Sequence, residues 1–465
     1  MQNPIDIKGY WWLPSLEENK LPGTLTFSQE DGAFLETVGV FSTEMTTQIE
    51  QPIIILGITQ QGKPITLYKC FYNQWTYPLI GLGGGKYRVR FVFEGVQFDS
   101  EEKIKFHQLC GSYTDLDAWV DIYGFTIEQD ITDGKFISKI RYEKPASQFF
   151  DIGDAFEVGI GFSSHGPNRS IIQTEVQISQ RAYLVIKSKN GDISFDDLFT
   201  QLNVFSYLLQ VAVQRVPYPI SVFGFSQENS HERDGKEAYY PEINIYYQPV
   251  ESILSQKERL PQEFLFTFRD LVSEQITPWF ASFDKYQTII HLYRSLFYSN
   301  RLFIETKFLN IAQALESLHS ILFGSQDLPH DKFVEQKERV LQVVPDDLIE
   351  WVGTALNSAN YKRFKSRILE LLTNKKVLIG QFVDDMDLFA KRVRDTRNEF
   401  VHHDKLRWTF QHGEELVSAI NLLTMLFEAY LLEIIGFSDE KVQELLEPKI
   451  QTHLTGWKHL RSNKK

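Results

Sequence analysis

The stretch RDTRNEFVHHD, residues 394–404, combines an arginine and a histidine at a spacing that suits chemistry on a phosphate group. Arginine is permanently charged and presents a fork of N–H donors, which Arg397 would supply. Histidine gains and loses a proton near neutral pH, and His402 follows five residues later. Together with Asn398, this set is compatible with RNA cleavage, with a metal site, or with a solvated helix end.

Helix geometry limits how these three residues can meet. Successive residues turn by about 100°, so Asn398 and His402 share one face, whereas Arg397 lies about 140° from His402. We therefore expect either that the last helical turn unwinds or that a second subunit completes the site. The stretch RWTFQH, residues 407–412, repeats the Arg-to-His spacing, but it is loop-like and lacks the asparagine, so we interpret it as a chance match.

Two adjacent His-Asp pairs, at residues 330–331 and 403–404, raise the alternative of a metal-dependent phosphohydrolase. Such enzymes of the HD type carry these pairs on helices, together with further His and Asp ligands. Pro329 places the first pair in a predicted loop, and the second pair follows a predicted helix end. Both placements count against a metal site, and we predict none.

Charge is distributed unevenly along the 465 residues, whose net charge is −13. Residues 251–465 hold 28 Lys and Arg against 30 Asp and Glu, whereas the first 250 residues hold 20 against 31. The acidic first part should repel a nucleic-acid backbone. We therefore expect any RNA to bind the C-terminal part.

The cysteine content and the absence of apolar runs predict a cytoplasmic protein without a membrane span. Two cysteines, Cys70 and Cys110, cannot form a disulfide framework and suit a reducing compartment. The N-terminal stretch MQNPIDIKGYWWLPS has no basic start followed by an apolar run, so no signal peptide is predicted. No run of about 18 uncharged apolar residues is present.

The hydrophobic period divides the chain into two predicted domains. Up to residue 250 it is close to two, as in GKYRVRFVFEGVQF (85–98), with further strands predicted at 118–130, 135–145, 156–164 and 174–188. Turn signals such as Asp133-Gly134 separate them, and one helix is predicted at 195–213. We predict a β-rich, sandwich-like or distorted-barrel domain over residues 1–250.

From residue 251 to 465 the period is 3.6, which predicts an all-α bundle and an α+β fold class for the whole chain. Pro261 is expected to open the helical run. One apolar stripe runs from Phe308 to Leu315, and a second follows a long helix from Glu414 to Ile434. A last helix is expected to begin after Ser438 and to stop at Pro448.

The run KRVRDTRN, residues 391–398, is basic and directly precedes His402. Lys391, Arg392 and Arg394 belong either to a solvated helix face or to a surface that follows an RNA backbone. Nearby acidic residues offset part of this charge, so a grip on RNA would be local.

These residues resemble a known family. The sequence RNEFVH, with FAKRVRDT before it and the long helix after it, resembles the HEPN ribonucleases and their R-x4-6-H motif. The helix KFLNIAQALESLHS (307–320) resembles the first core helix of that family and carries Glu316. A β-rich domain ahead of such a module, here with the core at about 300–440, resembles the ApeA class of bacterial anti-phage proteins.

The resemblance implies metal-independent RNA cleavage without a cofactor, by a homodimer or higher homo-oligomer. Attack by a 2′-OH would leave a 2′,3′-cyclic phosphate. His402 would act as general base or acid, Arg397 would hold the phosphate, and Asn398 would orient one of them. Glu316 would brace the arginine, and Lys391, Arg392 and Arg394 would contact RNA. The target would be cellular RNA such as tRNA, and the N-terminal domain would regulate the nuclease or sense a phage protein.

A second interpretation is a non-catalytic HEPN-like module for dimerisation or binding, in which His402 only ends a helix. Degradation of RNA in EDTA separates the three interpretations. Only the metal-independent nuclease would cleave under that condition, and only with His402 in place.

Overall fold

The computed structural model describes residues 2–41, 54–76, 83–169, 174–233, 236–249, 257, 259–298, 302–402, 408–411 and 413–453. The chain divides into two compact units, Met1–Ala281 and Ser282–Lys465. The first is β-rich and the second is helical, so the predicted α+β class is confirmed. Each unit is described in turn.

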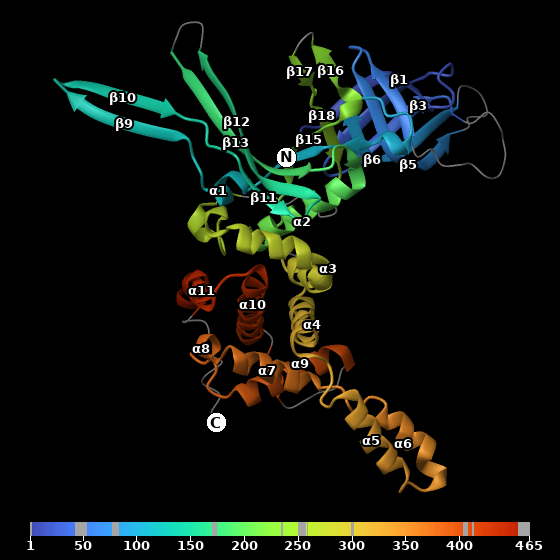
Figure 1. The fold of residues 1–465 in the computed structure, drawn as a ribbon, viewed down its shortest axis with the longest axis vertical. Helices are drawn as coiled ribbons and strands as arrows, with labels where there is room; N and C mark the ends of the chain where they lie inside the picture. The colour runs from blue at the N-terminus through green and yellow to red at the C-terminus, as the bar shows by residue number, and fades with distance from the viewer. Residues whose placement is uncertain are drawn as a thin grey trace. The chain divides into compact units, whose positions relative to one another are not determined.

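The N-terminal unit is built on a twelve-stranded antiparallel sheet, whose described strands follow the order β11-β12-β13-β8-β15-β18-β6-β3-β2-β1-β4-β5 (Figure 1). The strands of this unit are β1 Ile5–Trp12, β2 Leu21–Ser28, β3 Gly32–Val38, β4 Ile54–Thr59, β5 Pro64–Thr76, β6 Gly84–Glu94, β7 Lys105–Phe106, β8 Gln108–Tyr113, β9 Phe125–Thr132, β10 Lys135–Tyr142, β11 Gln148–Ile152, β12 Phe156–Arg169, β13 Val176–Ser188, β14 Ile193–Ser194, β15 Pro219–Phe225, β16 His231–Arg233, β17 Lys236–Tyr239 and β18 Ile243–Tyr247.

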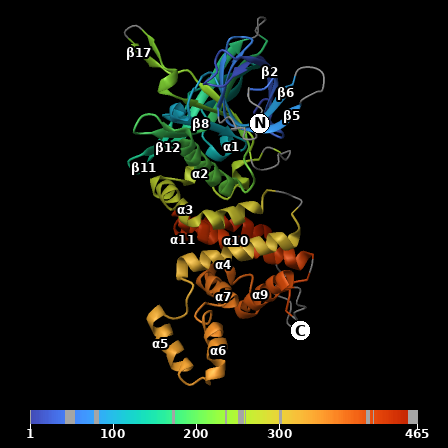
Figure 2. The ribbon, with the colours of Figure 1, turned by 90° about the vertical axis from the view of Figure 1, so that its right-hand side faces the viewer.

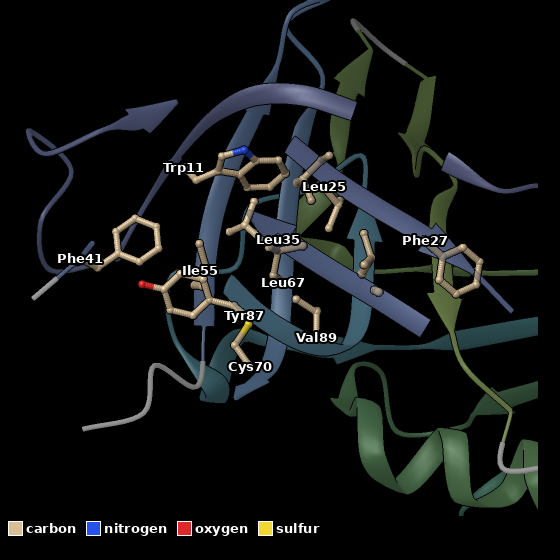
Figure 3. Packing of buried hydrophobic residues seen from close by; sticks show 13 residues of the cluster. Trp11, Leu25, Phe27, Leu35, Phe41, Ile55, Leu67, Cys70, Tyr87 and Val89 are labelled. Carbon is tan, nitrogen blue, oxygen red and sulfur yellow. The ribbon is translucent and has the colours of Figure 1, made fainter. Parts of the chain in front are cut away.

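Six of these strands close into a barrel, because β5 pairs with β6 as well as with β4. Side chains from all six strands fill the interior (Figure 3). The period-two pattern explains this packing, since alternate residues of a strand point to opposite faces. The buried cluster contains Trp11, Leu25, Phe27, Ala33, Leu35, Phe41, Ile55, Ile65, Leu67, Cys70, Tyr87, Val89 and Val92.

The rest of the sheet packs against helix α2 (Phe195–Val213), whose bounds agree with the helix predicted at 195–213. This helix contacts β8 and β13. Its first residue, Phe195, lies 5.0 Å from Phe91 and 4.9 Å from Phe93 between ring centroids. The strand β6 thus contributes aromatic side chains to the contact with α2 as well as to the barrel.

The division between the units lies later than the expected boundary at residue 250. Residues 259–281 pack onto the β-rich unit, where the indole N–H of Trp279 donates to the carbonyl of Val204 at 3.0 Å. The amide of Leu265 likewise donates to the carbonyl of Ala212 at 2.8 Å. The first helical turns after residue 250 therefore belong structurally to the first unit.

Two sequence predictions of local structure in this unit are wrong. Residues 118–120 lie in a short helix, α1 (Leu116–Val120), and not in a strand. Pro261 opens only a three-residue 3-10 helix, and the first long helix, α3, begins at Ser273. The apolar residues of α1, such as Trp119, are buried. Apolar residues of a strand would be buried in the same way, so an apolar segment alone does not distinguish this short helix from a strand.

The C-terminal unit is a helical bundle in which α10 forms the centre. Its elements are α3 Ser273–Ser295, which crosses the division between the units, α4 Ile304–Phe323, α5 His330–Leu341, α6 Ile349–Leu356, α7 Phe364–Asn374, α8 Lys376–Ile379, α9 Met386–His402, α10 Glu414–Ile435 and α11 Asp439–His453. The α10 helix packs against α4 and α11. By length and composition α10 could cross a membrane, but 78% of its most apolar window is buried in the structure, as in the core helix of a bundle.

The helices α5 and α6 form an arm that lies apart from the other helices of this unit in both views (Figures 1 and 2). Asn360 ties the base of the arm, because its side chain exchanges hydrogen bonds of 2.9 and 3.0 Å with the backbone of Leu328. The predicted loop at 330–331 is wrong, since α5 begins at His330 directly after Pro329. Proline is well suited to the position just before a helix or at its first turn.

The last helix begins where predicted but ends later. The hydroxyl of Ser438 accepts a hydrogen bond from the amide of Lys441 at 3.3 Å, as a helix N-cap does. However, α11 continues through Pro448 to His453. The prediction that Pro448 stops the helix is therefore wrong.

The barrel core generates a stability prediction. Leu35 is fully buried in β3, so we expect Leu35→Ala to lower the free energy of unfolding by about 2–5 kcal/mol in urea titrations. Val38, at the end of the same strand, is 50% exposed. Val38→Ala should cost less than about 1 kcal/mol. Equal losses for both variants would contradict the assignment of Leu35 to the barrel interior.

Candidate functional site

Helix α9 carries the Arg397–His402 motif and is held by its apolar face. The carboxylate of Asp385 accepts the amide N–H of Leu388 at 2.9 Å and so caps the start of the helix. Phe389, Ala390 and Val393 are buried, at the spacing of three and four residues that places them on one side. The side of α9 opposite this apolar face carries charged residues.

Three helices meet at Arg397. Its guanidinium lies 3.8 Å from the carboxylate of Glu316 on α4 and 5.3 Å above the ring of Phe364 on α7. It also donates a long hydrogen bond of 3.5 Å to the side-chain oxygen of Asn398. The side chain of Arg397 remains 31% exposed. The guanidinium is therefore positioned by its neighbours and still accessible to a ligand.

The α4 helix explains why Glu316 points to this place. Phe308, Ile311, Ala312 and Leu315 are buried in the bundle, so the next position along the helix, Glu316, turns to the edge of that stripe. There its carboxylate faces Arg397 on α9, and the two helices are in contact. The structure thus brings together the three sequence-predicted residues Glu316, Arg397 and Asn398.

His402 is exposed and is the last residue of α9. The helix is regular from Arg397 to His402, so the expected unwinding of its last turn does not occur. On a regular helix the two side chains leave the axis about 140° apart. Within one chain, α9 alone does not bring Arg397 and His402 together. The competing pair at residues 407 and 412 lies outside the described residues, as does the His-Asp pair at 403–404.

The three basic residues before the motif have different environments. The guanidinium of Arg392 donates to the carboxylate of Glu415 at 2.6 Å and to the carbonyl of Thr409 at 3.2 Å, and it lies over Phe410. Arg392 is thus engaged inside the fold, and the expectation that it contacts RNA is not supported by its position. An ion pair and an aromatic contact in a largely buried site hold it there.

Lys391 and Arg394 are both partly exposed. The ammonium of Lys391 is 4.6 Å from the centroid of the Trp408 ring. Arg394 donates to the carboxylate of Asp395 at 2.7 Å, and its side chain is partly exposed. These two residues keep the predicted accessibility, although each already has a partner on the protein.

The segment after the motif holds the end of α9 in place. The buried hydroxyl of Thr396 accepts the amide N–H of Phe410 at 2.9 Å. Phe410 packs 5.5 Å from Phe389 and 6.3 Å from Phe308, between ring centroids. Thr396 directly precedes Arg397 in the chain, so this contact fixes the backbone from which the arginine extends.

A polar cluster that the sequence did not reveal lies between α4 and α7. His319, fully buried, is 2.8 Å from the carboxylate of Glu370, which also accepts from Lys362 at 2.8 Å. Burial lowers the pKa of His319, and the contact with Glu370 opposes this effect without overcoming it. Hydrogen bonds from Lys362 and then His319 lower the pKa of Glu370. The cluster is one helical turn from Glu316 and stiffens the α4–α7 contact.

No group of three or more His, Cys, Asp or Glu side chains able to hold a metal ion is present in the part of the chain that the structure describes. His319 and Glu370 form a pair without a third such ligand. The described residues therefore give no support to the metal-dependent alternative.

Two family models match the chain. The one described as Apea-like HEPN matches residues 309–441, which contain Glu316, Phe364 and the α9 motif. The helical unit is thus an HEPN domain. The model described as ApeA N-terminal domain 1 matches residues 6–279, more than half of the chain. The chain belongs to the ApeA family of HEPN-based anti-phage defence proteins. No curated protein and no solved structure shows significant similarity to it.

Phe364 is the site residue that the sequence analysis missed. An aromatic ring under a guanidinium stabilises the charge and fixes the orientation of its plane. The only sequence signal was its place at the start of α7, within the basic run YKRFKSR (361–367). That signal does not identify the arginine that Phe364 contacts, because the two residues meet only through the tertiary fold.

The buried His319 generates a pH prediction. Because burial lowers its pKa in the folded protein, the unfolded chain takes up a proton at His319 more readily. Its contribution to stability is complete above the unfolded value of about 6.5 and is lost as the pH falls below that value. We expect the urea midpoint of His319→Gln to fall less than that of wild type between about pH 7 and pH 5.5. His330→Gln, at an exposed histidine of α5, should keep the wild-type slope, and identical slopes for all three proteins would contradict the assignment.

Proposed function

We propose that this protein is a metal-independent endoribonuclease that cleaves cellular RNA, with tRNA as the target class, in anti-phage defence. The observation that carries the proposal is the placement of Arg397. Glu316 and Phe364 fix its guanidinium while part of the side chain stays open to solvent. An exposed histidine ends the same helix. The matched HEPN domain makes ribonuclease chemistry the leading activity for this pair.

In the proposed reaction, His402 takes the proton from a ribose 2′-OH as general base. The 2′ oxygen then attacks the adjacent phosphorus, and the bond from phosphorus to the 5′ oxygen breaks. The products are a 2′,3′-cyclic phosphate and a 5′-OH end, whose oxygen takes a proton from a histidine acting as acid. Arg397 stabilises the charge that builds on the phosphate oxygens, since its guanidinium can donate two parallel hydrogen bonds.

Neighbouring residues would support these two groups. Glu316 limits the rotation of the Arg397 side chain, and Asn398 orients the guanidinium through its side-chain oxygen. Lys391 and Arg394 would contact the RNA backbone on either side of the cut, where they add affinity without sequence preference. Arg392 is left out of this set because Glu415 already holds it.

The proposed enzyme acts as a dimer, since one regular helix separates Arg397 from His402. Two copies related by a two-fold axis would bring the arginine of one α9 close to the histidine of the other. The β-rich unit would regulate this site or sense a phage protein. Its acidic composition supports a role other than holding RNA. The cytoplasmic location stays a prediction.

Single substitutions in EDTA test the proposal. We expect purified wild type to cleave tRNA in EDTA and to leave 2′,3′-cyclic phosphate ends. His402→Ala should lose about 10²–10⁴ of the rate, as removal of a general base does. Arg397→Ala should lose about 10²–10³ through the missing charge stabilisation. The 2′,3′-cyclic phosphate ends can be detected by a ligation assay, because these ends resist ligation until the cyclic phosphate is removed.

Two histidine controls make this test specific. His330→Ala changes an exposed histidine on the α5–α6 arm, and His412→Ala removes the chance match in the sequence; both should keep wild-type activity. Cleavage that EDTA abolishes would assign a metal enzyme. Absence of cleavage by activated wild type, together with intact phage protection by His402→Ala, would assign a non-catalytic module. Either outcome overturns the proposal.

A further inference from the structure

The start of α7 forms one wall of the site around Arg397. The helices α7 and α9 are in contact and lie side by side in both views (Figures 1 and 2). Phe364, the first residue of α7, is the residue whose ring lies against the guanidinium of Arg397. The three residues that lead into Phe364 therefore end beside the arginine that the proposed function places on the scissile phosphate.

Three of the four basic residues between positions 361 and 367 already have partners on the protein. The ammonium of Lys362 donates to the carboxylate of Glu370 at 2.8 Å. Lys365 lies 2.6 Å from the carboxylate of Asp387. The guanidinium of Arg367 donates to the backbone carbonyl of Lys362 at 2.9 Å. These three side chains are engaged in holding the helices together.

Arg363 is the fourth basic residue, and its environment is different. Its side chain is exposed and has no hydrogen-bond or ion-pair partner among the residues that the structure describes. The first turn of α7, which follows it directly, contains no acidic residue. An unpaired guanidinium attracts phosphate. Arg363 is therefore a free positive charge one residue away from Phe364, which contacts Arg397.

The exposed ring of Tyr361 lies on the same side of the chain as Arg363. The segment before α7 is extended, because Tyr361 forms a β-bridge with Gln326 and Arg363 has φ −71° and ψ 148°. Neighbouring side chains on extended backbone point to opposite sides. Lys362 points inward, where it contacts Glu370. Tyr361, which is 52% exposed, and Arg363 therefore both point outward, and about 7 Å separates their Cα atoms.

The backbone beneath these two side chains is already ordered. The amide of Lys362 donates to the carbonyl of Ser325 at 2.9 Å, and the amide of Tyr361 donates to the carbonyl of Ser358 at 3.2 Å. The hydrogen bond from Arg367 to the carbonyl of Lys362 closes the turn into α7. Binding at a segment that is fixed beforehand loses less conformational entropy. The segment can thus hold a ligand in a defined position relative to α9.

We propose that Tyr361 and Arg363 bind a nucleotide next to the scissile phosphate, with the ring of Tyr361 stacked on its base and Arg363 on its phosphate. This inference rests on the proposed function, in which Arg397 holds the scissile phosphate. Aromatic rings that stack on bases, combined with cations that follow the backbone, are the means by which proteins bind single-stranded RNA. In a duplex both faces of a base are covered by its neighbours. Tyr361 therefore selects an unpaired nucleotide, and the site prefers single strands to stems.

Binding measured without cleavage tests the role of Tyr361. Full-length His402→Ala protein in EDTA is titrated, by fluorescence anisotropy, into a labelled single-stranded RNA of about 12 nucleotides and into the same RNA annealed to its complement. We expect the single strand to bind more tightly. Adding Tyr361→Ala should weaken single-strand binding at least about fivefold and leave duplex binding unchanged. Tyr361→Phe, which keeps the ring, should retain the parent affinity.

The salt dependence of the same binding tests the role of Arg363. Arg363→Ala should reduce the slope of log affinity against log salt concentration by about 0.7, as the loss of one phosphate contact to a single strand does. Arg363→Lys keeps the charge and should keep the slope, and Tyr361→Ala should keep it too. Arg339→Ala, at an exposed arginine of α5, is the matched control and should leave both affinity and slope unchanged.

The outcomes separate this inference from the proposed function. An unchanged single-strand affinity in Tyr361→Ala, or an unchanged salt slope in Arg363→Ala, would overturn the inference alone when Arg397→Ala still weakens binding. A parent protein that binds neither the single strand nor the duplex would overturn the inference and the proposed function together.

Discussion

The contact between Arg397 and Glu316 is the interaction on which the account of this protein depends. It joins α9 to α4 at 3.8 Å, and the ring of Phe364 adds the third helix, α7. An arginine on an isolated helix would sample many conformations, and fixing it costs conformational entropy. Here the tertiary fold has already restricted the side chain. The fold thus holds this positive charge in place and leaves part of the side chain exposed.

The regular geometry of α9 sets the second constraint. The same helix that fixes Arg397 directs His402 away from it, because five residues on a regular helix correspond to about 140°. Under the proposed function, the arginine of one copy would therefore work with the histidine of a second copy. Under the proposed function, activity is linked to assembly, and any surface that changes self-association also changes the number of complete sites.

Much of the fold followed from periodicity and turn residues in the sequence. The change from a period of two to one of 3.6 gave the α+β class, and α2 and α10 lie where their apolar patterns placed them. The closed barrel did not follow, because the pairing of β5 with β6 joins strands through contacts that no local pattern specifies. The prediction that Pro448 ends the last helix was wrong because it also rested on a local preference alone. The packing of α11 outweighs the local preference of proline to end a helix.

For the site, the sequence identified residues with a local signature and missed those defined by tertiary contacts. Glu316 and Arg397 were selected by their motif settings, and the structure places them together. Phe364, His319 and Glu370 were missed because an aromatic residue, a histidine and a glutamate on helices are ordinary when seen singly. Arg392 was selected for its charge, but Glu415, 23 positions later in the chain, holds that charge inside the fold. Charge in a sequence does not reveal whether a partner neutralises it.

The most direct measurement of the central claim uses a mixed dimer. Arg397→Ala and His402→Ala chains, each inactive alone, carry different affinity tags, are co-expressed, and are purified through both tags. If the arginine of one copy works with the histidine of the other, one of the two sites is intact, and the mixed dimer should regain about half of the wild-type activity. Activity no higher than that of either parent would place both groups of a site in one chain and contradict the account.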